Sequence, residues 1–274
     1  MTTRINSIRN NRGFSLAEVL IALILTGLVT TALFGTYITQ HKNYIVQDDI
    51  TEIQQAARAS IDELQRQIRM AGYELPQGMA YLVAANTDPD TITLAYANEG
   101  CDTYLSAAMP QPSSELKCAT DVSCFSAGQW VYIFEPDSGG GEFFEITHVQ
   151  PGSNHLQHNT MTLSKAYSQD AVILSVTQAK FFIDSTTDAS RPCLMMQLLG
   201  QPAQVYAENI SDLQFRYRLT NGMIVDLPPV LEDIRQIDIT VTGRSRNPEV
   251  DREGHDNYRY RTYTSSVALR NLGV

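Results

Sequence analysis

Residues 14–38 have the sequence FSLAEVLIALILTGLVTTALFGTYI, and Glu18 carries the only formal charge in this stretch. As an α-helix with a rise of about 1.5 Å per residue, the stretch would extend roughly 37 Å, against about 30 Å for the hydrocarbon core of a bilayer. It is therefore predicted to be a membrane-spanning helix. A secretory signal peptide would have a shorter apolar region that ends in a small-residue cleavage site, and no convincing site of that kind follows here.

The distribution of charge indicates the orientation of the chain and its partners. Arg4, Arg9 and Arg12 precede the apolar stretch. The positive-inside rule therefore keeps residues 1–13 in the cytoplasm, and the chain after about His41 crosses the inner membrane into the periplasm. The formal net charge is −10 and the pI is near 4.9. Because phosphate binding needs clustered positive charge, we expect no nucleic-acid partner for the folded part.

The carboxylate of Glu18 needs a physical reason. A plain single-span anchor would account for the hydropathy of the stretch but not for Glu18. A carboxylate costs about 2.5–3.5 kcal/mol at the middle of a bilayer, and less near an interface. Ionisable residues inside apolar segments usually mark a partner or a function, so Glu18 is expected to belong to a functional motif.

The residues that precede and include Glu18 form such a motif, because residues 12–18 have the sequence RGFSLAE. This sequence resembles the prepilin signature of type IV pilin-like proteins: a basic residue, Gly, Phe, Ser or Thr, Leu, any residue and Glu. The resemblance implies that a prepilin peptidase cleaves between Gly13 and Phe14, which removes the leader 1–13, and that Phe14 is then N-methylated. It also implies that Glu18 pairs with the terminal amine of a neighbouring subunit, so that the N-terminal helix binds other major and minor pilins.

Helical spacing continues beyond the apolar stretch, without a proline until Pro76. Apolar residues recur every three or four positions, as on one face of an α-helix, at Val46, Ile50, Ile53, Ala57, Ile61, Leu64, Ile68 and Ala71. Gly72 then gives a stop signal. We expect one long helix with a transmembrane, filament-core half over residues 14–40 and an amphipathic half over residues 41–73. A coiled coil would also fit the spacing, but the strand pattern downstream offers a sheet to pack on.

Two further stretches narrow the resemblance. Residues 56–73, AARASIDELQRQIRMAGY, are similar to the segment that closes this helix in minor pilins of the PilW type, and residues 268–271, ALRN, resemble the end of those proteins. The length of 274 residues also favours a minor pilin over a major one. The expected function is that of a structural subunit in the assembly and priming of a type IV pilus. The alternatives are a minor pseudopilin of a type II secretion system and a pilus-borne adhesin subunit.

The periodicity changes after Pro76. Runs rich in β-branched and aromatic residues alternate with turns, which predicts strands over residues 81–85, 91–96, 130–134, 142–149, 160–163, 171–176, 179–183, 194–199, 204–210, 213–219, 223–227, 234–242 and 258–268. Asn221 and Gly222 favour a hairpin with a type I′ turn. The expected fold is α+β and pilin-like, in which the long N-terminal helix packs on an antiparallel sheet of a periplasmic domain that covers residues 74–274.

Four cysteines lie in the β-rich part, namely Cys101, Cys118, Cys124 and Cys193. Their even number and the expected oxidising compartment make all four candidates for disulfides, and the sequence does not choose among the connectivities. Residues 99–128 contain three of them together with two prolines, which indicates a stapled loop. Zinc binding is the alternative role for these cysteines, but the sequence contains no C-x-x-C pair.

No set of residues argues for catalysis, a metal or a cofactor, and we expect a protein that is not an enzyme. Residues 139–141, GGG, lack the Lys-Ser/Thr and the strand-to-helix context of a phosphate-binding loop. His148, His155 and His158 match no metal-site spacing and are expected in exposed loops. The stretch from Asp251 to Asp256 is acidic but falls short of an EF-hand pattern, which leaves calcium binding there undecided.

Overall fold

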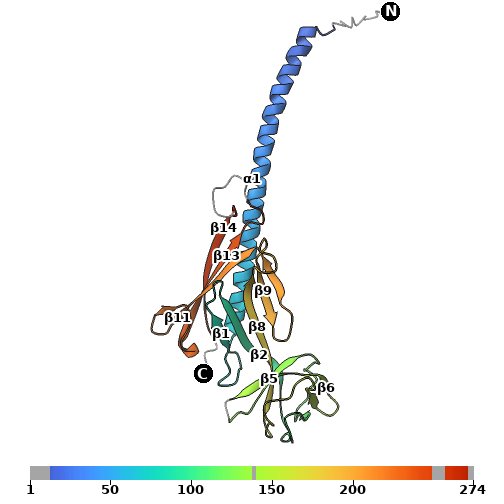
Figure 1. Ribbon diagram of the computed structural model, residues 1–274, viewed down its shortest axis with the longest axis vertical. Coiled ribbons are helices and arrows are strands. Elements are labelled where there is room, and N and C mark those ends of the chain that lie inside the picture. The colour runs from blue at the N-terminus through green and yellow to red at the C-terminus, as the bar shows by residue number, and fades with distance from the viewer. Residues whose placement is uncertain (1–12, 138–139, 249–256, 271–274) are drawn as a thin grey trace, which may run out of the picture. The chain divides into compact units, whose positions relative to one another are not determined.

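The structure is a computed structural model that describes residues 13–137, 140–248 and 257–270. Its one long helix, α1, is Leu16–Met70. The chain divides into two compact units, residues 1–50 and residues 51–274. The first unit holds the N-terminal part of α1, and the second holds the remainder of α1 and the strands (Figure 1).

The strands of the second unit form three sheets, and every pairing among the described residues is antiparallel. The first sheet has the order β1-β2-β8-β4-β5, with β9 beside β8 and β10 beside β9; its strands are β1 (Leu82–Ala85), β2 (Thr91–Tyr104), β4 (Trp130–Phe134), β5 (Gly141–Glu145), β8 (Val172–Asp184), β9 (Cys193–Leu198) and β10 (Gln204–Glu208). The second sheet has the order β12-β11-β13-β14; its strands are β11 (Ile210–Leu219), β12 (Ile224–Val225), β13 (Ile234–Arg244) and β14 (Tyr260–Ala268). The third sheet has the order β3-β7-β6; its strands are β3 (Leu116–Lys117), β6 (His148–Gln150) and β7 (His155–Gln157).

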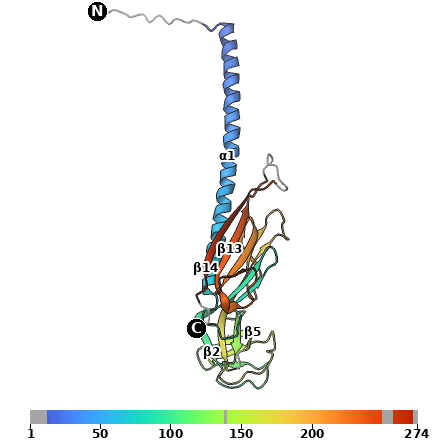
Figure 2. The same cartoon turned by 90° about the vertical axis from the view of Figure 1, so that its left-hand side faces the viewer.

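The part of α1 in the second unit packs through the face that its spacing predicts. Ala57, Leu64 and Ile68 are fully buried. They share one hydrophobic core with apolar side chains of β2 and β8 in the first sheet and of β11 and β13 in the second. Figures 1 and 2 show this part of α1 beside strands β13 and β14. The predicted α+β fold, a long N-terminal helix followed by antiparallel sheets, is confirmed.

Two glycines set the path of the chain around this core. Gly72, which follows the end of α1, has a φ of 83°, a conformation that an L side chain rarely adopts. Its N–H donates a hydrogen bond to the carbonyl of Ala95 in β2 at 2.9 Å. Gly243 in β13 lies against the helix, because a Cβ atom there would be 2.7 Å from Cγ2 of Ile53. The missing side chain therefore allows α1 and β13 to approach closely.

A second hydrophobic core lies apart from α1 and is built from β3, β4, β5 and β7. Leu116, Ile133, Phe144 and Leu156 are each fully buried in it. A disulfide joins Cys101 to Cys124, with their Cα atoms 5.7 Å apart, and Cys101 is part of this core. The interval 99–128 is thus closed by a covalent link, as its composition indicates.

The other two cysteines do not form the disulfides for which they were candidates. Cys118 and Cys193 are free thiols in the structure. Cys118 is buried in the second core, and burial raises the pKa of its thiol to about 11. Cys193 begins β9, where it pairs in register with Asp184 of β8 and Glu208 of β10. Cys118 lies just after β3, where it forms an isolated bridge with Leu105, so the two free thiols lie on different elements.

Several predicted strand boundaries are corrected by the structure. The predicted strands 171–176 and 179–183 are one strand, β8, and the predicted strand 142–149 is divided between β5 and β6. Residues 160–163 are not a strand. Strands β3 and β7 were not predicted, because runs of two and three residues are too short to show alternation.

The predicted hairpin forms at Asn221 and Gly222, but its turn is not of type I′. That type requires a positive φ at both central residues, and here Gly222 has a φ of 84° whereas Asn221 has no positive φ. The N–H of Gly222 donates to the carbonyl of Leu219 at 2.9 Å, and the N–H of Leu219 donates to the carbonyl of Met223 at 2.8 Å. The loop is thus the longer kind, in which a left-handed glycine follows the turn.

The prediction that His148, His155 and His158 lie in exposed loops is wrong. His148 and His155 lie in β6 and β7, and His158 is only 3% exposed. Its Nδ1 lies 2.9 Å from the carbonyl oxygen of Met161, and its Nε2 lies 2.8 Å from that of Ser114. The imidazole of His158 therefore has a structural role, since it lies between two loop segments and can donate a hydrogen bond to a backbone carbonyl.

The carboxylate of Glu135 holds the loop before β8 in place through hydrogen bonds. Its carboxylate accepts hydrogen bonds from Nζ of Lys165 at 2.6 Å and from the N–H and Oγ of Ser168 at 3.1 and 2.9 Å. Lys165, and then Ser168, lower the pKa of Glu135 from 4.5 to about 2. The stability that this carboxylate contributes should therefore be complete above pH 4.5 and lost as the pH falls toward about 2.

Because Glu135 lies near the surface, we expect this contribution to be about 1 kcal/mol or less. The measurement is the difference in free energy of unfolding between the wild type and Glu135→Gln, from denaturant titrations at a series of pH values. The difference should be constant near neutral pH and shrink in the acidic range. A difference that does not change with pH would contradict the assignment to the ionised carboxylate.

Candidate functional site: the apolar half of the helix

The first unit exposes apolar side chains along its helix. Large apolar residues are 41–86% exposed at Phe14, Leu16, Val19, Leu20, Ile21, Leu23, Ile24, Leu25, Leu28, Val29, Leu33, Phe34, Tyr37, Ile38, Tyr44 and Ile45. Among the described residues, α1 is the helix whose length and apolar composition suffice to cross a membrane, and the apolar window is not buried inside the structure. A contiguous apolar surface of this size marks a membrane or a protein–protein contact.

The helix begins with a capping box formed by Ser15 and Glu18. The N–H of Ser15 donates to Oε2 of Glu18 at 2.9 Å, and the N–H of Glu18 donates to Oγ of Ser15 at 3.3 Å. Each side chain thus satisfies a backbone donor that has no partner within the helix. Ser15 had no assigned role in the sequence prediction, although the spacing Ser-x-x-Glu ahead of an apolar run is the signal that identifies such a box.

The polar side chains within the apolar stretch are satisfied by the helix itself. The hydroxyl groups of Thr26, Thr30, Thr31, Thr36 and Thr39 each donate to the carbonyl four residues earlier, at 2.7–3.0 Å. An unpaired hydroxyl group is costly in hydrocarbon. Because these hydroxyl groups are paired within the helix, the stretch presents an apolar surface despite its threonines.

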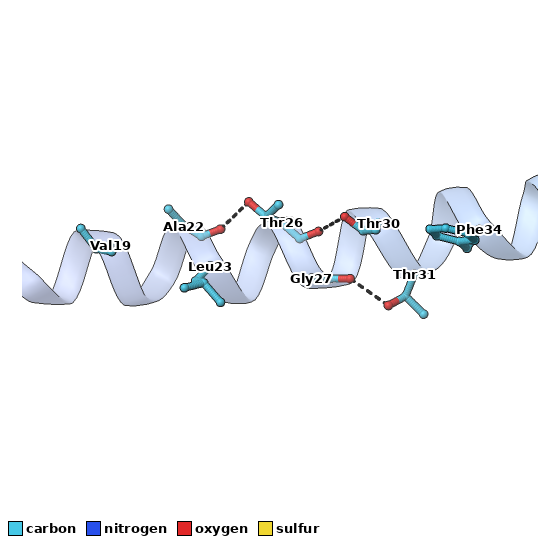
Figure 3. Close-up of a pocket in the computed structure, with 8 residues that line it drawn as sticks. All are labelled: Val19, Ala22, Leu23, Thr26, Gly27, Thr30, Thr31 and Phe34. Atoms are coloured by element: carbon cyan, nitrogen blue, oxygen red, sulfur yellow. Dashed lines mark hydrogen bonds between the residues drawn. The ribbon is translucent and has the colours of Figure 1, made fainter.

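One face of this helix carries a shallow groove lined by small residues (Figure 3). Ala22, Thr26 and Thr30 follow one another at four-residue spacing, and Gly27 and Thr31 lie beside them. A Cβ atom added to Gly27 would meet nothing within 4 Å. Small residues at this spacing let a second helix approach closely in an apolar environment. The groove is therefore suited to packing against another helix.

The predicted processing site lies next to the start of the helix. Gly13 and Phe14 are exposed, Phe14 to 86%, and a Cβ atom added to Gly13 would meet nothing within 4 Å. The structure therefore does not itself require glycine at position 13. The resemblance to the prepilin signature assigns the requirement for glycine to the peptidase that cleaves this bond.

The described residues show no candidate metal site. Within residues 13–137, 140–248 and 257–270, no group of three or more His, Cys, Asp or Glu side chains is arranged to hold a metal ion. The acidic stretch from Asp251 to Asp256 and the leader residues 1–12 lie outside the described residues.

The exposed apolar helix, capped at its start and followed by antiparallel sheets, defines the layout of a membrane-anchored, pilin-like protein. Comparison with protein families gives a match to the prokaryotic N-terminal methylation motif over residues 8–34. No curated protein matches the chain. The motif includes Gly13, Phe14 and Glu18 and supports a type IV pilin-like or pseudopilin-like protein. It implies processing by a prepilin peptidase and assembly with other pilins.

Proposed function

We propose that the chain is a minor pilin of the PilW type, a structural subunit in the assembly and priming of a type IV pilus. The observation that carries this proposal is the helix of the first unit, whose large apolar side chains from Leu16 to Ile38 are exposed and which begins with the methylation motif. In a monomer this surface needs lipid, and in a filament it needs the helices of other subunits. The same helix thus suits both the membrane-anchored and the assembled state.

The chemistry of the two states differs at Glu18. Before assembly, the carboxylate of Glu18 has a local partner, the N–H of Ser15. After cleavage, the methylated amine of Phe14 on a neighbouring subunit would supply a positive charge, and the pair would be neutral within the apolar core of the filament. The rest of the chain would lie in the periplasm, as the arginines ahead of the helix favour, and then in the pilus at the cell surface.

The test of the proposal is mass spectrometry of the chain extracted from membranes. In cells with an active prepilin peptidase, the mature chain should begin at N-methylated Phe14, and in cells without the peptidase it should retain the leader, residues 1–13. A chain that keeps its first thirteen residues in both strains would contradict the proposal, since residues 1–13 are the predicted leader.

The alternative is a minor pseudopilin of a type II secretion system, which shares the motif. Sheared surface filaments separate the two functions, because a pilus subunit is recovered with them and a secretion subunit is not. Complementation of a strain that lacks the gene gives a second criterion, since it restores either pili or secretion. We propose a structural subunit without enzymatic activity or cofactor, because the matched motif is that of pilin-like subunits.

A further inference from the structure

The second unit contains a polar cleft beside strand β8. Strand β2 accompanies β8 along one side, whereas the other side of β8 is shared by two strands. The pairing with β4 ends at Ser175, and the pairing with β9 begins at Ala179. A cleft of about 240 Å³ opens in this gap, and its lining includes Asn98, Gln129, Trp130, Thr177, Gln178 and Gln201.

Three of the polar side chains in the cleft are fixed in one network. Nδ2 of Asn98 and Nε2 of Gln129 both donate to Oγ of Ser175 at 2.8 Å, and Ser175 is 1% exposed. Oγ1 of Thr177 donates to Oδ1 of Asn98 at 2.8 Å. Side chains that are held in place before a ligand arrives lose little conformational entropy on binding. These side chains are thus held in place by one another.

Trp130, the only tryptophan in the chain, forms part of the lining of the cleft. Trp130 is partly exposed, and its indole lies against Gly200. Gly200 has a φ of 74°, and a Cβ atom there would overlap Nε1 and Cδ1 of the indole. The glycine therefore both forms the turn after β9 and leaves the space that the indole occupies. A large aromatic side chain that remains partly exposed at a cleft provides a flat apolar surface for a ligand.

Two amides at the cleft have no partner in the described part of the chain. The side chains of Gln178 and Gln201 donate and accept no hydrogen bond there, unlike those of Asn98 and Gln129. Each offers both donors and an acceptor to a ligand. Among the residues that the structure describes, no charged side chain lines this cleft. The arrangement therefore suits a neutral molecule with several hydroxyl groups and one apolar face.

We propose that this cleft binds a neutral saccharide, with a sugar ring against Trp130 and its hydroxyl groups bonded to the amides of Gln178 and Gln201. The volume is slightly below the range of about 300 Å³ and more that is usual for drug-sized ligands, so it suits a ring-sized unit. A second cleft of about 210 Å³ shares Gln178, Leu198 and Leu199 with the first, and a second unit of an oligosaccharide would extend there. A nucleic acid, which also stacks on aromatic rings, would need a basic groove.

The test uses the fluorescence of Trp130, because no other tryptophan contributes. The full chain in detergent is titrated with glucose, galactose, N-acetylglucosamine, lactose, cellobiose and chitobiose. We expect a saturable change in fluorescence with at least one of them. For that saccharide, the variant in which Gln178→Ala and Gln201→Ala are combined should bind about tenfold more weakly, since it lacks the hydrogen bonds of two amides.

The matched control is Gln204→Ala, because Gln204 is an exposed glutamine on β10 outside the cleft. This variant should bind as the wild type does, and circular dichroism should give the same spectrum for all three proteins. The proposal is overturned if none of the six saccharides changes the fluorescence at a concentration of about 10 mM, where even a weak site would be occupied. It is also overturned if the combined variant binds as tightly as the wild type, or if Gln204→Ala weakens binding equally.

Discussion

Replacing Glu18 by Val should leave membrane insertion intact and prevent incorporation of the chain into filaments. In the proposed assembly, the carboxylate of Glu18 neutralises the terminal amine of a neighbouring subunit within an apolar core. Without it, that ammonium group is buried and unpaired, which costs about 3–5 kcal/mol. This corresponds to a loss of roughly 10²-fold or more in the equilibrium for assembly. Insertion should not suffer, since Val removes a charge from an apolar segment.

Two further variants separate the charge of Glu18 from its role in the capping box. Its carboxylate accepts a hydrogen bond from the N–H of Ser15, so a defect of Glu18→Val could come from a poorly capped helix. Gln also serves in a capping box, and Glu18→Gln therefore keeps the cap while it removes the charge. Ser15→Ala does the opposite, since it removes the hydroxyl that caps the N–H of Glu18 and keeps the charge.

The measurement is the share of each variant in sheared filaments and in membranes, compared by immunoblot in cells that lack the wild-type gene. Charge pairing predicts that Glu18→Val and Glu18→Gln are both absent from filaments, whereas Ser15→Ala is incorporated. A role in helix capping alone predicts the reverse order for Glu18→Gln and Ser15→Ala. Incorporation of Glu18→Gln at the level of the wild type would thus refute charge pairing.

The helical parts of the fold could be predicted because their signals are local. Apolar residues at intervals of three and four placed Ala57, Leu64 and Ile68 on one face, and all three are buried. The spacing did not predict that Ser60 and Gln67 are buried too. Both sheets contribute to the core around α1, so the buried arc of the helix is wider than the apolar stripe that one sheet would need.

The β-rich part depended on contacts between residues far apart in the chain, and there the sequence was less informative. Strand composition indicated antiparallel pairing but not the division into separate sheets. The cleft beside β8 could not be predicted, because Asn98 and Ser175 are 77 residues apart and meet only through the pairing of β2 with β8. The pairing of Cys101 with Cys124 was one of several open connectivities, which spacing alone does not distinguish.

The largest effect on stability is expected at Leu64, in the hydrophobic core that α1 shares with the two larger sheets. This side chain is 0% exposed and packs within the core that α1 shares with both sheets. Leu64→Ala removes its buried methyl groups and leaves a cavity, because close-packed neighbours on the helix and on the two sheets relax only in part. We expect the free energy of unfolding of the second unit to fall by about 2–5 kcal/mol.

The matched control lies on the same helix, two residues earlier. Asp62 is exposed, so Asp62→Ala changes a helical residue to Ala without creating a cavity and should alter stability by about 0.5 kcal/mol or less. Denaturant unfolding of the full chain in detergent gives both values, with circular dichroism for the secondary structure and Trp130 fluorescence for the first sheet. If α1 is an integral part of the core, both signals shift to lower denaturant together in Leu64→Ala. A shift no larger than that of Asp62→Ala would mean that the sheets are stable without the helix.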